Sequence, residues 1–284
     1  MLTVTQQFAD RVDVRGPAGH LAYRHGGLPK SCVHPLTTPA GRVLTGFEMS
    51  DHTWHRGLWF AIKFINGTNF WEEHKPFGVQ AHTVGPAVDL LNESAVRITS
   101  GIDWTSAATG PVIRESRRIK HHLVAPGVAA VDWTCRLVAM QDLTLDRTPF
   151  TTWGGYGGLI LRTSREFHKA HLLLPTGEPT QQVAGTPGEW ILMNGLLDGG
   201  RDAKASFGFV DHPNNPRGPS PWYARCTPEV NYVNAAFLFN EPMTVAKGVT
   251  LSFDYRALLK DDHFTQAEFA PLAEAFRAST PETA

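Results

Sequence analysis

Short apolar stretches separated by turn-forming residues run along most of the chain. Residues 58–65 are apolar at nearly every position, as in a strand covered on both faces, and Asn66-Gly67 then supplies a turn that needs a positive φ. Residues 131–137 instead alternate between apolar and polar side chains, which is typical of a half-buried strand. Further strand-like stretches lie at residues 95–99, 112–122, 129–138, 205–210, 233–239 and 249–259. The pattern predicts a dozen or more antiparallel strands.

One stretch near the C-terminus has apolar residues at helical spacing and predicts a short amphipathic helix, in a tail at about residues 265–279. The apolar residues at this spacing are Phe269, Leu272, Ala273 and Phe276. Thr265 and Glu268 fit a capping box, but Pro271 would then fall inside the helix, so we expect the helix to begin near Pro271. The predicted fold class is all-β, a large antiparallel β-sandwich with a short C-terminal helix.

The composition fits one folded domain over residues 1–284. Hydrophobic residues make up 42% and charged residues 19%, which is enough apolar material for a core. Because 26 Lys and Arg residues nearly balance 27 Asp and Glu residues, no net electrostatic field favours binding to nucleic acid or to an anionic membrane. The first residues lack a basic segment followed by an apolar one, and no run of about 18 apolar residues occurs. We expect a cytoplasmic protein with no nucleic-acid or membrane partner.

Sequence signals for common cofactors and cross-links are weak. Cys32, Cys135 and Cys226 are odd in number and lack CxxC spacing, which argues against a disulfide framework and a structural zinc site. Residues 153–159 are rich in glycine but lack the GxGxxG spacing and a following helical pattern. We expect no nucleotide cofactor, and these glycines indicate a bulge or a close backbone approach.

Titratable side chains gather within residues 34–74. His52 and His55 lie three positions apart, so on a regular strand they face opposite sides, and they converge only where strand alternation is broken. If they converge, neutral imidazoles suit a proton-transfer pair or a divalent metal such as Zn or Mn, with His34 as the third ligand. The alternative is that both histidines bond to nearby backbone.

Further candidates surround this pair. Arg56, Glu72 and His82 could serve as an oxyanion holder and as general acid or base, together with His52 and His55. Candidates for contacting the substrate are Trp54, Trp71, Arg117, Tyr156, Asp211, His212, Asn214, Arg217 and Trp222. We expect the polar cluster at residues 211–217 to adjoin the histidines. Aromatic side chains beside polar loops suit stacking on a sugar ring, although packing in the core is the commoner fate of Trp, and a solvated strand face is the alternative for Arg117.

Several of these motifs, in order over residues 20–260, resemble the family labelled "methane oxygenase PmoA". They are His34-Pro35-Leu36, Asp51-His52, His55-Arg56-Gly57-Leu58-Trp59, Phe70-Trp71, Gly154-Gly155-Tyr156-Gly157-Gly158-Leu159 and Asp211-His212-Pro213. The resemblance implies a soluble β-sandwich of the galactose-mutarotase-like supersandwich type rather than a membrane oxygenase subunit. Members of that family accompany sugar oxidoreductases and isomerase-like proteins, which implies a carbohydrate role. The usual family stretch is Asp-His-x-His-His-Arg-Gly, and Trp54 replaces the first of its paired histidines.

We therefore expect an enzyme that acts on a small-molecule carbohydrate. The leading hypothesis is a lyase or hydrolase acting on a glycoside or keto-sugar by histidine acid–base chemistry, with or without a divalent metal. A mutarotase-like epimerase is the near alternative, and a non-catalytic sugar-binding sandwich is the rival from another class. The sequence leaves a homo-oligomer open.

Overall fold

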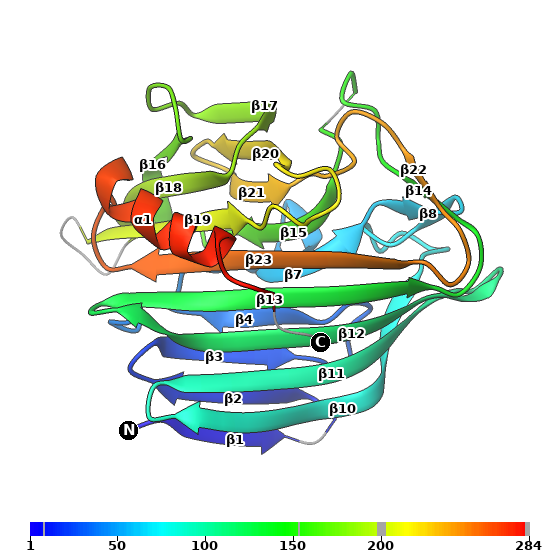
Figure 1. The fold of residues 1–284 in the computed structure, drawn as a ribbon, viewed down its shortest axis with the longest axis horizontal. Coiled ribbons are helices and arrows are strands. Elements are labelled where there is room, and N and C mark those ends of the chain that lie inside the picture. Colours follow the sequence, from blue (N-terminus) through cyan, green and yellow to red (C-terminus); the bar gives the residue numbers. More distant parts are fainter. Residues whose placement is uncertain (8, 153, 198–202, 282–284) are drawn as a thin grey trace.

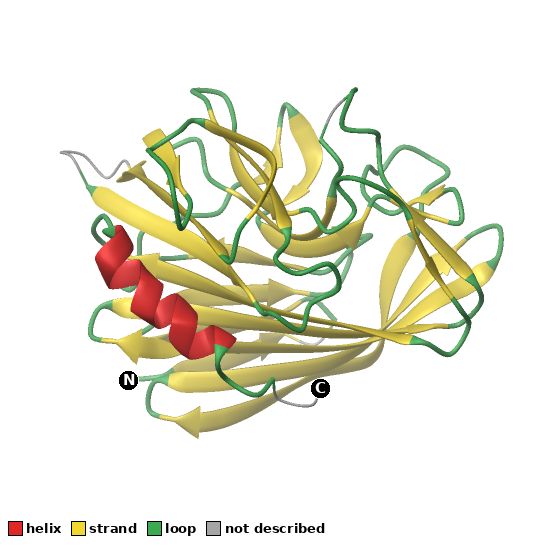
Figure 2. Ribbon diagram, turned by 45° about the horizontal axis from the view of Figure 1, so that its top comes forward, coloured by secondary structure: helices red, strands yellow, loops and turns green. Residues whose placement is uncertain are grey.

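Two large antiparallel sheets make up most of the molecule (Figures 1 and 2). The computed structural model describes residues 1–7, 9–152, 154–197 and 203–281. Within these residues one sheet has nine strands and the other has eight, and a single helix lies near the C-terminus. The predicted all-β antiparallel sandwich with a short C-terminal helix is confirmed.

The nine-stranded sheet has the order β1 (Thr3–Gln7), β2 (Arg11–Gly16), β3 (Gly19–Arg24), β4 (Cys32–Leu36), β7 (Leu58–Ile62), β15 (Gly157–Arg162), β21 (Asn231–Ala235), β20 (Pro221–Cys226) and β17 (Gln182–Pro187). The eight-stranded sheet has the order β10 (Val79–Asn92), β11 (Ala95–Ser106), β12 (Gly110–Ala125), β13 (Val128–Ala139), β23 (Thr250–Lys260), β19 (Lys204–Asp211), β18 (Trp190–Leu197) and β16 (Phe167–Leu173). Two smaller sheets contain β22 (Met243–Val245), β14 (Leu143–Asp146), β8 (Phe64–Ile65) and β9 (Thr68–Asn69), and β5 (Phe47–Met49) with β6 (His52–Arg56).

The two large sheets share one hydrophobic core. The ring of Phe60 on β7 lies 5.1 Å from that of Phe253 on β23, and 6.2 Å from that of Trp104 on β11. Along β11, buried residues alternate with partly exposed ones, as a strand with one face in the core requires. This contact between aromatic rings of both sheets fixes the sandwich face to face.

The middle of the nine-stranded sheet is buried on both faces, as the apolar run at residues 58–65 predicts. Leu58, Phe60 and Ile62 of β7 belong to the core between the sheets, whereas Trp59 and Ala61 belong to a second apolar cluster. Successive strand residues point to opposite faces, so this second cluster lies on the face of the sheet turned away from the core. That outer face carries the site described below.

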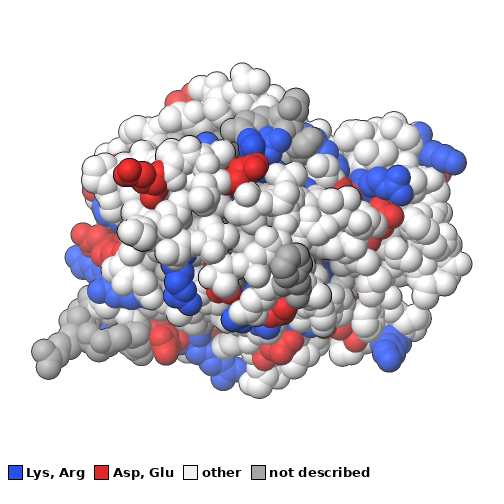
Figure 3. Space-filling model, turned by 90° about the horizontal axis from the view of Figure 1, so that it is seen from below, with Lys and Arg blue, Asp and Glu red and all other residues white. Residues whose placement is uncertain are grey.

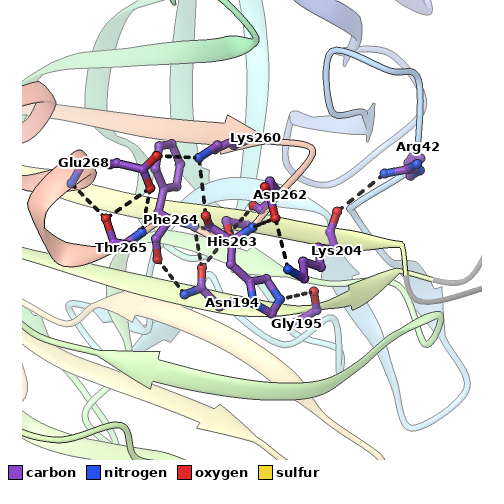
Figure 4. A network of polar contacts seen from close by, with 11 residues as sticks. Arg42, Asn194, Gly195, Lys204, Lys260, Asp262, His263, Phe264, Thr265 and Glu268 are labelled. Atoms are coloured by element: carbon purple, nitrogen blue, oxygen red, sulfur yellow. Dashed lines mark hydrogen bonds and ion pairs between the residues drawn. The ribbon is translucent and has the colours of Figure 1, made fainter.

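Helix α1 (Gln266–Arg277) begins five residues earlier than the sequence suggested. The Thr265 side chain accepts a hydrogen bond from the Glu268 backbone, and Glu268 reaches back to Thr265, so the capping box is complete (Figure 4). Asn194 of β18 anchors the preceding loop by bonding both backbone groups of Phe264 (Figure 4). The expected start near Pro271 is wrong, because these caps and the burial of Phe269 outweigh the one backbone donor that the proline lacks.

The surface carries charges of both signs. In the view from below, Lys and Arg side chains are interspersed with Asp and Glu rather than gathered in one field (Figure 3). No helix among the described residues is long and apolar enough to cross a membrane. The three cysteines are buried and free, and burial raises the pKa of Cys32 to about 12, which makes it a poor nucleophile.

Candidate functional site

A pocket of about 550 Å³ opens on the outer face of the nine-stranded sheet. Its volume falls in the range of about 300–1,000 Å³ that is usual for small-molecule sites. It is lined by His52, Trp54, His55, Lys63, Trp71, Glu72, Thr148, Tyr156, Ile160, Arg162, Tyr223, Arg225, Thr227, Glu229, Val230, Tyr232 and Asn234. Aromatic, cationic and hydrogen-bonding groups therefore share one cavity.

The floor of the pocket consists of side chains from three paired strands, β15, β21 and β20. Cross-strand partners point to the same face of a sheet. Ile160 of β15 pairs with Asn234 of β21, which in turn pairs with Tyr223 of β20. One row further along, Arg162 pairs with Tyr232, and Tyr232 pairs with Arg225. Two rows of side chains from three neighbouring strands thus project into the pocket.

The two histidines converge at one wall of the pocket. His52 and His55 stack with ring centroids 4.6 Å apart and an interplanar angle of 19°. Met49 of β5 pairs with His52 of β6, and Phe47 pairs with Arg56, so the register shifts: β6 advances four residues where β5 advances two. These additional residues break the strand alternation that would have separated the rings.

The histidines have different electrostatic surroundings. His52 Nδ1 lies 2.9 Å from Asp51 Oδ2, which also accepts a 2.7 Å bond from Arg162. Burial alone would raise the pKa of Asp51, but the bonds from His52 and Arg162 outweigh it and hold that pKa well below its usual range. His55 is 8% exposed, and its Nδ1 is buried without a protein partner. Burial, reinforced by His52 and Arg162, lowers the pKa of His55 well below its usual range, so this ring is neutral at neutral pH.

A carboxylate lies in the same cavity. Glu72 forms an ion pair with Lys63 and accepts a 2.7 Å hydrogen bond from the Asn69 side chain. Burial would raise the pKa of Glu72, but the bond from Lys63 outweighs it and lowers that pKa. Glu72 is therefore ionised at neutral pH and suits an acceptor role rather than proton donation.

Aromatic rings form a continuous wall. Trp71 and Tyr156 stack with centroids 4.9 Å apart, and Tyr223 lies 5.5 Å from Tyr156. A Cβ at Gly154 would lie 2.2 Å from the Tyr223 ring, so the glycine lets the backbone pass directly over that ring and places Tyr156 in the wall. The close backbone approach expected at residues 153–159 is confirmed at Gly154. The pocket thereby gains a flat apolar surface bordered by phenol hydroxyls.

Six of the predicted site residues line this pocket: His52, Trp54, His55, Trp71, Glu72 and Tyr156. Arg56 does not, because the residue after His55 on β6 points the other way and pairs with Glu48 and Glu73. His34 also lies apart, where its Nδ1 is 3.0 Å from Thr45 Oγ1 and its ring stacks on Phe47.

The expected metal set of His34, His52 and His55 is therefore not assembled. Over residues 1–7, 9–152, 154–197 and 203–281, no group of three or more His, Cys, Asp or Glu side chains is arranged to hold an ion. We assign no step to a metal.

Two other predicted residues belong to the interior side of the sandwich. Arg117 is 0% exposed and bonds Glu115 through Nε at 2.6 Å, so it forms a buried ion pair instead of meeting a substrate. His82 lies 3.0 Å from the Tyr23 hydroxyl and lines a different cavity, beside His25. Polar residues in the middle of long strands gave no sign of which side they face.

The cluster at residues 211–217 does not adjoin the histidines, so that expectation is wrong. Asp211 is buried and accepts bonds from Asn215 and from the Ser220 backbone, and burial raises its pKa to about 6. His212 bonds the backbone oxygen of Ser279 beyond α1. Arg217 donates to the backbone oxygens of Glu241 and Pro242. These contacts fasten loops and the helix together.

Two more members of the predicted set also lie outside the pocket lining. Asn214 is an exposed loop residue. Trp222 is 0% exposed within the core and donates to the backbone oxygen of Gly188. Its neighbour Tyr223 points to the opposite face of the strand and lines the pocket instead.

Sequence reasoning missed the residues of the floor. Arg162, Arg225 and Tyr232 carried no role, although Arg162 ends an apolar strand and Arg225 follows Trp222-Tyr223. A polar residue in an otherwise apolar strand was the available signal. Only the pairing of β15, β21 and β20 shows that the three share one face.

Comparison with known proteins gives similarities of fold. An alpha-galactosidase from Lactobacillus brevis has 7% sequence identity and a TM-score of 0.49, over 93% of this chain and 41% of that chain. A galactose mutarotase related enzyme from Lactobacillus acidophilus has 8% identity and a TM-score of 0.39, over 94% of this chain and 99% of that one. The GalM/aldose epimerase homologue from C. elegans has 7% identity and a TM-score of 0.36, over 93% and 99%.

No curated protein matches the sequence. The model of one protein family matches residues 16–274, which is most of the chain. The protein belongs to that family, the family of unknown function DUF6807.

Proposed function

We propose that this protein is a sugar-active enzyme that opens and recloses the ring of an aldose in this pocket and so interconverts its anomers. The observation that carries the proposal is the stacked pair of His52 and His55, in which one ring is tied to a carboxylate and the other is neutral with a free buried nitrogen. A proton donor and a proton acceptor thus stand side by side at the wall of a pocket of suitable size.

The reaction needs two proton transfers around one carbon. A base accepts the proton of the anomeric hydroxyl while an acid donates a proton to the ring oxygen, and the bond between the anomeric carbon and the ring oxygen breaks. The product is the open-chain aldehyde. Rotation about the next carbon–carbon bond and the reverse transfers close the other anomer, so no atom or electron is gained or lost.

The surroundings of the two rings assign their roles. Asp51 bonds the Nδ1 of His52 and orients this ring, and an imidazolium held in that way donates its proton from Nε2. Burial keeps His55 neutral, and its unpartnered Nδ1 can accept one. Tyr156, backed by the buried Trp71 on which it stacks, and the half-buried Trp54 supply apolar surface for the C–H groups of the sugar ring.

Elimination from a keto-sugar is the second candidate, favoured by Arg162. Its Nη1 is buried without a partner and can stabilise an enolate after His55 removes the acidified proton. Hydrolysis by a carboxylate pair has less support. Such a pair needs an acid with a raised pKa, whereas Glu72 is ionised and bonded to Lys63.

The test follows anomer exchange of freshly dissolved aldoses by polarimetry, with 3-keto-glycosides in parallel for elimination. We expect the purified protein to accelerate exchange, and His52→Asn and His55→Asn each to remove the acceleration. Arg114→Gln, an exposed change on β12, is the control. Sugar binding with no turnover, and equal affinity in both histidine variants, would instead identify a non-catalytic sugar-binding protein.

A further inference from the structure

We propose that the sugar bound in this pocket carries a carboxylate, held by Arg162 and Arg225; this inference rests on the proposed function for the sugar itself. The two arginines occupy one row of the floor, on either side of Tyr232. Neighbouring strands lie about 4.8 Å apart, so their Cα atoms are separated by roughly 10 Å. Both guanidinium groups reach the same cavity.

Arg162, which lines the pocket, has an unused donor. The residue is 1% exposed, and its Nη2 bonds Asp51 Oδ2 at 2.7 Å and the backbone oxygen of Glu229 at 3.2 Å. Its Nη1 is buried and has no partner. A buried donor on a charged group is costly to leave unpaired, which points to an acceptor supplied by a ligand.

Arg225 has no anionic partner among the described residues. Its guanidinium carbon lies 5.9 Å from the centre of the Tyr223 ring, and its Nε is buried without a hydrogen bond. The nearby carboxylate of Glu229 belongs to an exposed residue and forms no ion pair with it in the described structure. A half-buried guanidinium that stacks on a phenol and lacks a counter-ion is suited to a planar anion.

The charge of the lining favours a carboxylate over a phosphate. Counted with both histidines neutral, the lining has three cations, Lys63, Arg162 and Arg225, and two carboxylates, Glu72 and Glu229, which leaves one excess positive charge. Just outside the lining, Asp51 bonds both Arg162 and Arg165, and counting Asp51 together with Arg165 leaves that sum unchanged. A carboxylate carries one negative charge, whereas a phosphate monoester carries about 1.5 to 2 at neutral pH. A uronic acid, which keeps its anomeric carbon, therefore matches the pocket better than a sugar phosphate or a neutral sugar.

The experiment measures dissociation constants by calorimetry for matched probes: D-glucose, D-glucuronate and D-glucose 6-phosphate, and the galactose and mannose counterparts of the first two. We expect one uronate to bind about tenfold or more tightly than its neutral sugar. Arg225→Gln should bring that ratio close to one, and Arg225→Lys should restore part of it. Arg114→Gln, which changes an exposed arginine on β12, should leave the ratio as in the wild type.

Equal affinity for every neutral and uronate pair, no binding of any uronate, or tighter binding of the phosphate would overturn the inference. An Arg225→Gln variant that weakens both sugars by the same factor would do so as well. Because binding is read without turnover, the two proposals fail separately. A uronate that binds selectively but is not converted refutes the epimerase and supports the carboxylate site, whereas turnover of neutral sugars without preference does the reverse.

Discussion

Arg117 offers a sharp test of how the structure divides core from pocket. The residue is 0% exposed, bonds Glu115 through Nε at 2.6 Å and Nη2 at 2.8 Å, and bonds Ser31 Oγ at 2.6 Å. Its guanidinium lies 4.9 Å from the centre of the Trp133 ring. Arg117→Ala leaves the carboxylate of Glu115 buried without its cation. Breaking one partner out of a buried ion pair typically costs about 3–5 kcal/mol.

The assay is urea unfolding followed by tryptophan fluorescence, and we expect the free energy of unfolding to fall by about 3–5 kcal/mol in Arg117→Ala. Arg114→Ala, three residues earlier on β12 and exposed beside Asp103, should leave the unfolding midpoint unchanged. Replacing the whole pair, with Glu115→Leu and Arg117→Met together, should recover most of the loss because no buried charge remains. A stable Arg117→Ala protein that no longer binds the sugar would refute the core role of Arg117 and show that this residue contacts the substrate.

Three further predictions concern the pocket, the acid response and the backbone. Trp54→Ala should weaken sugar binding a few-fold to about tenfold without changing the unfolding midpoint, because this half-buried ring lines the pocket. An unchanged affinity for the sugar would show that Trp54 does not contact it. Burial lowers the pKa of His121 to about 4, so between pH 6.5 and 4 the unfolded chain binds more protons than the folded one, and the free energy of unfolding falls on acidification. His121→Gln should reduce this dependence of the free energy of unfolding on pH, measured by urea titrations at several pH values. An unaltered pH dependence contradicts the prediction. Gly158 has φ +101, and a Cβ there would lie 2.2 Å from the Ala235 backbone oxygen, so Gly158→Ala should lower the melting temperature. Gly127 also has a positive φ, +70, but a Cβ there would meet no atom within 4 Å, so Gly127→Ala should lower the melting temperature less.

The fold class was predictable because strand patterns report burial. The continuous apolar run of β7 identifies a strand covered on both faces, and the alternation along β13 identifies a half-buried one. The helix start was missed because a single proline was weighed above a complete capping box. Local sequence patterns therefore predicted which elements form, but not where an element begins when two signals at its end disagree.

The site was predictable only where its residues are close in sequence. His52, His55 and Trp71 lie within one short segment, so the density of polar and aromatic residues pointed to them. Arg162 and Arg225 reach the same cavity through the pairing of three strands that are distant along the chain. Which face a strand residue occupies depends on register, and a shift of one position reverses it, as Trp222 and Tyr223 illustrate.

The most direct test of the central claim is anomer exchange measured by NMR on wild-type protein and on His55→Asn, with the matched aldoses and uronates as substrates. We expect the wild type to accelerate exchange of at least one sugar over its spontaneous rate. We expect His55→Asn, shown to be folded by its unfolding curve, not to accelerate it, because the neutral acceptor in the pocket is gone. Exchange that proceeds equally fast with the wild type, with His55→Asn and without protein would contradict it.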